Sequence, residues 1–131
     1  MSETSVVEAV GKDLFIAGKW VPATGGRTFG VEDPSTGRIL CEVADASPED
    51  GMAALDAAVA AQREWAATAP RQRSEILRRA FELLTARNED LALLMTLEMG
   101  KPLAEARGEI AYAAEFFRWF AEEAVRIDGG Y

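Results

Sequence analysis

The spacing of apolar residues changes at Ser47-Pro48, and this change constrains the fold more than any other feature of the chain. Before it, short runs of β-branched and aromatic residues are separated by turn residues; after it, apolar residues recur every three or four positions. Short bounded runs are typical of strands, and a spacing of three or four is typical of helices. The sequence therefore predicts an α/β fold in which a β-hairpin and further strands precede four helices.

The first pair of strands is predicted from a tight turn. Leu14–Ile16 and Lys19–Val21 flank Ala17-Gly18, a connection of two residues. The glycine in this connection can adopt the positive φ that a short hairpin turn requires. We therefore expect an antiparallel β-hairpin here.

A second pair of strands surrounds a strong turn signal. Thr28–Val31 is followed by Asp33–Gly37, which contains the Pro, Ser and Gly residues typical of turns. In the strand after the turn, Ile39, Cys41 and Val43 fall on one face by the period-two rule. Cys41 is therefore expected to be a small packed residue and not a reactive thiol.

Capping residues mark the expected ends of the helices. Ser47 can cap the first helix, Pro48 suits its first position, and Asn88 can cap the third. Gly100 and Pro102 provide a stop before the fourth helix. The four predicted spans are 48 to about 68, 71 to about 87, 88 to 99, and 103 to 127.

The second and fourth helices each carry an apolar stripe. On the second, Ile76 and Leu83 belong to the stripe, and a group of arginines lies mainly off it and is expected to be solvated. These arginines are Arg71, Arg73, Arg78 and Arg79. The stripe of the fourth helix is Leu103, Ala106, Ile110, Ala113, Phe117, Phe120, Ala124 and Ile127, widened by Tyr112, Phe116 and Trp119. This spacing is compatible with a coiled coil, but small seam residues beside aromatic ones favour a helix packed inside a larger globular body.

Composition and charge exclude several classes of function. The net charge is -8, with 22 acidic and 14 basic residues, so repulsion from phosphate backbones argues against a nucleic-acid partner. The apolar stretches are far shorter than the roughly 18 residues of a membrane helix, and the N-terminus resembles neither a signal nor a transit peptide. We therefore expect no membrane partner and a cytoplasmic location.

The chain also lacks the residues of self-contained catalysis. It has 0 His and 1 Cys, which removes every Ser-His or Cys-His pair. Gly100-Lys101 precedes Pro102, not Ser or Thr, so it is no P-loop, and no GxGxxG run is present. We predict no catalytic and no cofactor-binding residues within the chain.

Three runs of residues carry more information than their secondary structure. The run Thr96–Ala106, followed by Gly108-Glu109-Ile110, resembles the helix-turn-helix signature near the start of aldehyde dehydrogenases. Ile16–Val21 resembles the opening hairpin of the family, and Asp33–Gly37 resembles its Asn-Pro-x-Thr-Gly turn with Asp33 in place of Asn. The segments 94–98, 112–114 and 119–123, together with Phe116, are most similar to the succinate-semialdehyde type.

The resemblance implies a domain organisation and an activity. It implies that residues 1–13 are an N-terminal tail and that 14–131 form the first part of a coenzyme-binding domain that continues beyond this chain. The nucleophilic cysteine, the glutamate base and the residues that bind NAD or NADP would all lie later. The complete protein would be a homo-oligomer that oxidises succinate semialdehyde, or a related small aldehyde, and this chain alone would be inactive.

The resemblance also assigns two pairs of site residues. Val31, through its carbonyl, and Glu98 match ligands of a structural monovalent cation, although Glu98 is also compatible with an ordinary solvated side chain. Tyr112 and Phe116 match residues that line the substrate channel, and the alternative is ordinary core packing. A competing class of function is a non-enzymatic helical binding or scaffold module, which the acidic surface and the heptad-like last helix would support.

Overall fold

A computed structural model describes residues 2–127 of the chain and divides it into two compact units. The first unit contains the residues up to Ala66 together with Leu97–Gly100. The second contains Ala67–Thr96 and the chain from Lys101 onward. The predicted α/β class is confirmed, because short strands precede four long helices.

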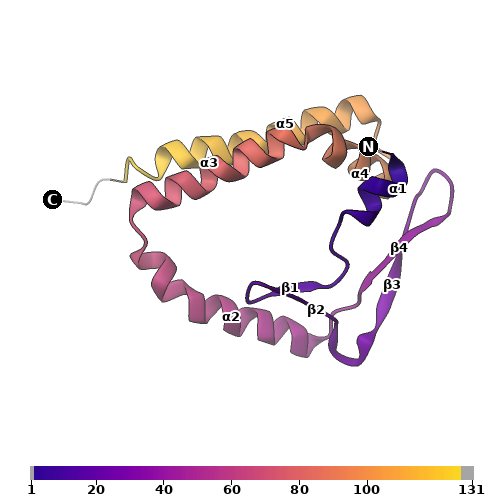
Figure 1. Cartoon of the computed structure of the whole chain (residues 1–131), viewed down its shortest axis with the longest axis horizontal. Helices are drawn as coiled ribbons and strands as arrows, with labels where there is room; N and C mark the ends of the chain where they lie inside the picture. Colours follow the sequence, from indigo (N-terminus) through magenta and orange to yellow (C-terminus); the bar gives the residue numbers. More distant parts are fainter. Residues whose placement is uncertain (1, 128–131) are drawn as a thin grey trace. The chain divides into compact units, whose positions relative to one another are not determined.

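The predicted opening hairpin is confirmed (Figure 1). β1 (Leu14–Ile16) and β2 (Lys19–Val21) pair antiparallel, with Leu14 opposite Val21. Ala17 and Gly18 between them both have positive φ, 51° and 78°. Two consecutive positive φ values are typical of a two-residue type I′ turn, whose twist matches the twist of the two strands it joins. Ala17 therefore occupies a conformation that residues with a Cβ rarely adopt.

The second pair of strands is built around a hydrogen-bonded turn. β3 (Thr28–Glu32) and β4 (Ile39–Ala44) pair antiparallel, and Figure 1 shows them side by side. In the turn, the buried carboxylate of Asp33 accepts hydrogen bonds from the Ser35 hydroxyl at 2.7 Å and from the Thr36 hydroxyl at 2.8 Å. These hydroxyls, Ser35 foremost, lower the pKa of Asp33. Asp33 thus supplies the hydrogen-bond acceptor of this turn, at the position where the resembled family carries Asn.

The predicted common face of Ile39, Cys41 and Val43 is wrong for Ile39. The register shifts so that Val31 pairs with Cys41 and Glu32 pairs with Ile39, which leaves an extra residue in β4. An extra residue interrupts the alternation of side chains along a strand. Ile39 consequently is 56% exposed, whereas Cys41 and Val43 are half-buried.

The start of the first long helix is tied to an upstream loop. α2 (Pro48–Ala67) begins at Ser47, whose hydroxyl accepts the Asp50 N–H at 3.3 Å, while the Asp50 carboxylate accepts the Ser47 N–H at 2.8 Å. This reciprocal pair is a capping box with Asp at its third position. The same carboxylate accepts the Thr24 hydroxyl at 2.7 Å, in the 3₁₀ turn η1 (Thr24–Gly26). Asp50 therefore takes part in capping α2 and also binds the loop that contains η1.

A helix that the sequence analysis did not predict lies in the expected N-terminal tail. α1 (Glu3–Glu8) is capped by Ser2, whose hydroxyl accepts the Ser5 N–H at 3.2 Å. Val6 is buried, so this short helix packs against other residues of the described chain.

The second unit consists mainly of helices close to their predicted spans. α3 (Pro70–Ala86) and α5 (Leu103–Glu123) lie side by side in Figure 1, and α4 (Asn88–Met99) precedes α5. α5 ends four residues before the predicted end at Ile127. A small core joins α4 to α5, where Ala92 packs with Ala106 and Ile110.

The packed faces of α3 and α5 differ from the predicted stripes. On α3, Ile76 is 53% exposed whereas Ser74 is buried. On α5, Phe120 is 55% exposed, and the buried residues are Ala106, Ile110, Ala114 and Ala121. Small side chains allow helices to approach closely, so the alanine face packs and much of the predicted aromatic stripe stays outside.

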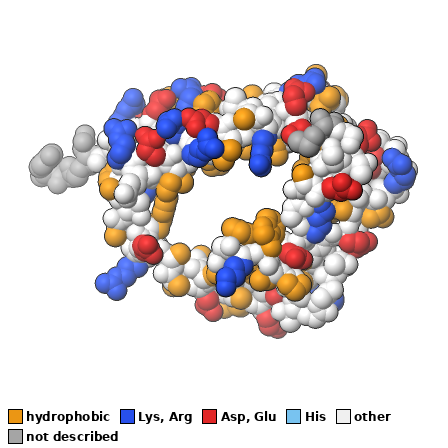
Figure 2. Space-filling model, in the orientation of Figure 1, with side chains coloured by type: hydrophobic (Ala, Val, Ile, Leu, Met, Phe, Trp, Pro, Cys, Tyr) orange, Lys and Arg blue, Asp and Glu red, His pale blue; other side chains and the backbone are white. Residues whose placement is uncertain are grey.

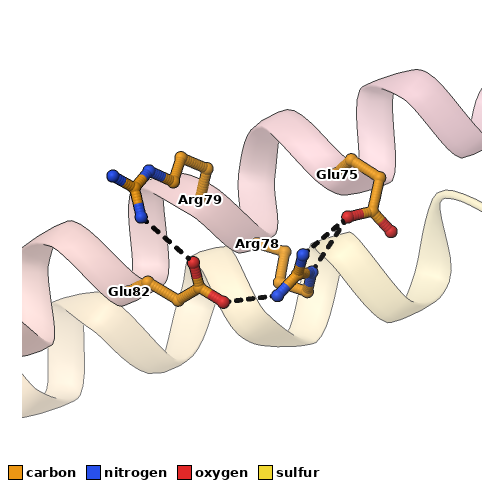
Figure 3. A network of polar contacts seen from close by, with 4 residues as sticks. All are labelled: Glu75, Arg78, Arg79 and Glu82. Carbon is orange, nitrogen blue, oxygen red and sulfur yellow. Dashed lines mark hydrogen bonds and ion pairs between the residues drawn. The ribbon is translucent and has the colours of Figure 1, made fainter.

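The solvated arginine face is confirmed for three of its four members. Arg78 pairs with Glu75 at 2.8 Å and also with Glu82, which contacts Arg79 at 3.5 Å (Figure 3). Arg71 is exposed, but Arg73 is half-buried, and its Nε has no hydrogen-bond partner among the described atoms. In Figure 2, basic and acidic side chains are interspersed along the α3 and α5 pair.

None of the helices between residues 2 and 127 is both long enough and apolar enough to cross a bilayer.

Replacing Ala17 by Asn is expected to stabilise the chain by about 0.5–1 kcal/mol, because Asn adopts positive φ at lower cost than Ala. The measurement is urea unfolding followed by circular dichroism. The matched control is Ala60→Asn at an exposed position of α2, which should destabilise by up to about 0.7 kcal/mol through lower helix propensity. A lower urea midpoint for Ala17→Asn than for the parent chain would contradict the assigned turn.

Replacing Asp50 by Asn is expected to destabilise the chain at neutral pH and to have a smaller effect in acid. Hydrogen bonds, the Ser47 N–H foremost, lower the pKa of Asp50 from 3.8 to about 2. A lowered folded-state pKa stabilises the fold above the unfolded value, and this stabilisation is lost as the pH falls toward 2. Urea midpoints measured between pH 7 and pH 2 should converge for the parent and Asp50→Asn. Exposed Asp13→Asn is the control, and a pH-independent gap for Asp50→Asn would refute the role of its charge.

Candidate functional site

An exposed pair of aromatic rings on α5 is the centre of the candidate site. Tyr112 and Phe116 are four residues apart, so they lie on one side of the helix. Their ring centroids are 4.9 Å apart with an interplanar angle of 84°, an edge-to-face contact. Tyr112 is 66% exposed and Phe116 48% exposed. Neither ring is part of a packed core within the described chain.

Further residues extend this pair into a shallow groove of about 440 Å³. Trp119 and Phe120 follow at three and four residues beyond Phe116, and Glu115 lies at the edge. Trp119 is 58% exposed and Phe120 55% exposed. The five residues that line it, here called the aromatic groove, are Tyr112, Glu115, Phe116, Trp119 and Phe120. Sequence reasoning named only Tyr112 and Phe116 as site residues, although the helical spacing of the other aromatic residues pointed to the same face.

The aromatic groove has the chemistry of a wall and not of a catalytic centre. Its single carboxylate, Glu115, accepts a hydrogen bond from Arg118 Nε at 2.7 Å. Glu115 also raises the pKa of Arg118. Aromatic faces exclude water and contact the apolar part of a small molecule. The groove can therefore guide a ligand but offers no nucleophile and no free base.

A larger cleft of about 480 Å³ lies between α3 and the end of α5. Arg71 and Ser74 of α3 line it together with Ala121 of α5 and Val125 just beyond that helix, which shows that the two helices run antiparallel. Its charges are largely paired within the chain. These pairs include Arg78 with Glu75 and Glu82, and Arg118 with Glu122. We therefore assign this cleft to packing and to surface ion pairs.

The two predicted cation ligands belong to the same compact unit. Val31 lies in β3, and Glu98 is the exposed penultimate residue of α4. Gly100 follows with φ of 75°, and a Cβ atom there would lie 3.2 Å from Pro34 Cγ. The end of α4 thus lies against the turn that follows β3. Among residues 2–127, no group of three or more His, Cys, Asp or Glu side chains is arranged to hold a metal ion.

Cys41 does not resemble an activated nucleophile. It is half-buried in β4, and the chain contains no histidine that could act as its base. That the chain holds no catalytic residue stays a prediction.

Comparisons with known proteins place the chain in a family. The profile described as "Aldehyde dehydrogenase family" matches residues 20–131. A succinate-semialdehyde dehydrogenase of Paenarthrobacter nicotinovorans is 70% identical over 93 residues, which are 71% of this chain and 21% of that enzyme. A glutarate-semialdehyde dehydrogenase of Pseudomonas putida is 49% identical over 118 residues, which are 90% of this chain and 25% of that enzyme.

A solved structure supports the same assignment. The crystal structure titled as an Escherichia coli NADP dependent enzyme superposes with a TM-score of 0.88 and 45% identity, over 91% of this chain and 25% of that one. The chain spans about a quarter of the length of these relatives or less. Because the family profile covers most of its residues, the chain belongs to the aldehyde dehydrogenase family.

Proposed function

We propose that this chain is the N-terminal portion of an NAD(P)-dependent dehydrogenase that oxidises succinate semialdehyde, or a related semialdehyde, to the carboxylic acid. The observation that carries the proposal is the aromatic groove on α5, in a chain 70% identical to a succinate-semialdehyde dehydrogenase over 93 residues. In such an oxidation the aldehyde carbon gives a hydride to the coenzyme and gains an oxygen atom from water. A water-excluding approach to the reacting carbon favours this chemistry.

The contribution proposed for this segment is the entrance wall of the aldehyde channel. Tyr112 and Phe116 would contact the short carbon chain of the substrate, and Trp119 would extend the wall along α5. The residues that line the groove include no nucleophile paired with a base that could activate it. We therefore propose that the 131-residue chain alone is inactive.

The coenzyme is proposed to be NAD or NADP, bound outside these residues. A nicotinamide coenzyme accepts the hydride when it is bound. The glycines of the described chain serve turns and helix ends, including Gly18 in the hairpin and Gly100 at the end of α4. They form no glycine-rich phosphate loop, so no step is assigned to a coenzyme here. A homo-oligomer and a cytoplasmic location are proposed for the complete protein.

The competing function is a non-enzymatic helical module that binds another protein through the aromatic groove. The exposed rings and the net charge of -8 favour it. The match over residues 20–131 to an enzyme family favours the dehydrogenase. The two functions differ in whether any aldehyde is oxidised, and the assay below separates them.

A structural monovalent cation is proposed at Val31 and Glu98. A backbone carbonyl and a carboxylate supply the hard oxygen ligands that such ions prefer. The closeness of Gly100 to Pro34 supports the proposal, because a Cβ atom at Gly100 would lie 3.2 Å from Pro34 Cγ, which puts the end of α4 near the turn three residues beyond Val31. Glu98 is exposed, which leaves its carboxylate accessible to an ion.

The complete dehydrogenase that carries this segment is expected to reduce NAD or NADP in the presence of succinate semialdehyde, whereas residues 1–131 alone should reduce neither. The measurement is the absorbance of the reduced coenzyme with three substrates: succinate semialdehyde, glutarate semialdehyde and butanal, which lacks the carboxylate. Activity with the two carboxylated aldehydes supports the proposal. No oxidation of any aldehyde by the complete protein would favour the binding module.

Potassium is expected to raise the thermal midpoint of the complete dehydrogenase when it replaces choline in the buffer, because an ion that binds only the folded state stabilises it. Glu98→Gln should remove most of this rise by replacing a carboxylate ligand with a neutral amide. Glu105→Gln, at an exposed position in the first turn of α5, is the control. An equal potassium response in Glu98→Gln and the parent would rule out Glu98 as a ligand.

A further inference from the structure

The packed face of α5 consists mainly of small side chains. Three of its four buried residues are alanines, namely Ala106, Ala114 and Ala121, and Ile110 is the exception. Helix register is set by side chains that project into the grooves of the neighbouring helix. Alanine permits close approach but projects very little. Contacts outside this face can therefore add to what holds α5 in position, beside the packing of Ile110 against Ala92 and Ala106.

Polar contacts near the start of α5 supply such a constraint. Arg107 binds Glu89 of α4 through two nitrogen atoms, with Nε at 2.9 Å and 3.1 Å from the two carboxylate oxygens and Nη2 at 2.8 Å from one of them. The backbone carbonyl of Arg107 accepts a hydrogen bond from the Asn88 side chain at 3.2 Å. Residue 107 is thus held through both its side chain and its backbone by two consecutive residues of α4. Lys101 adds an ion pair with Glu109 across the start of the same helix.

The geometry of these bonds restricts orientation as well as distance. A guanidinium that meets a carboxylate through two nitrogens fixes their relative angle, which a single point contact does not. The pair with Arg107 also lowers the pKa of Glu89, so both groups are charged at neutral pH. The two partners are largely exposed, so the contact adds little to overall stability and acts mainly on position.

We propose that Arg107 is a positioning residue for the aldehyde site, because its attachment to Asn88 and Glu89 sets the rotation and axial position of α5 and so the direction of the aromatic groove. This inference rests on the proposed function. Tyr112 lies five residues beyond Arg107, about 7.5 Å along the helix, and Phe116 lies about 13.5 Å along it. A continuous helix transmits rotation over such distances, so a change at residue 107 turns both rings.

The test is steady-state kinetics of the complete dehydrogenase with Arg107→Ala, Arg107→Lys and Glu89→Gln. Arg107→Ala is expected to raise KM for the semialdehyde about fivefold and to leave kcat within about twofold, because a channel wall contributes equally to substrate and transition-state binding. Glu89→Gln should have a similar effect, and the double variant should be no worse than either single variant. Arg107→Lys keeps the charge but loses the two-nitrogen contact, so it should restore KM only in part.

Arg79→Ala is the matched control, since Arg79 is an exposed arginine that contacts Glu82 on α3. It should leave KM, kcat and the thermal midpoint unchanged. An unchanged KM in Arg107→Ala, in a complete enzyme that oxidises the semialdehyde, overturns the positioning role and leaves the proposed function standing. A fall in both kcat and the thermal midpoint of Arg107→Ala would assign Arg107 a merely structural role and also overturn the inference. A parent enzyme that oxidises no aldehyde overturns both.

Discussion

Close packing of the alanine face of α5 is the constraint on which the rest of the second unit depends. Ala106, Ala114 and Ala121 are buried, so α5 approaches its neighbours along that side. Tyr112 and Trp119 lie on another side of the helix, where both remain exposed. One helix thus carries a packed face and an unpartnered face, and the unpartnered face is the candidate site. The polar contacts of Arg107 determine how that face is directed.

Local signals predicted the elements well because each element is closed by nearby residues. The hairpin at Ala17-Gly18 and the cap at Ser47 depend on contacts within a few positions, and both are confirmed. Two features escaped prediction for physical reasons. The bulge before Cys41 depends on pairing with another strand. The short helix α1 buries Val6, and no local sequence pattern predicts that burial.

The candidate site was only partly accessible from the sequence. Resemblance supplied Tyr112 and Phe116, but helical spacing alone did not reveal whether the aromatic or the alanine residues of α5 pack. Both sets recur every three or four positions, so periodicity fits either. The role proposed for Val31 has no side-chain signal at all, because a backbone carbonyl is present in every residue. Ligand positions of that kind follow only from a fold or a family.

Family membership and the geometry of α5 together lead to one central claim, that the aromatic groove faces the aldehyde in a complete semialdehyde dehydrogenase. The most direct measurement is a crystal structure of the complete enzyme with the carboxylic acid product bound. If the groove faces the aldehyde, carbon atoms of Tyr112 and Phe116 should lie within about 4.5 Å of the product. A product bound elsewhere, with both rings buried against other protein segments, would contradict it.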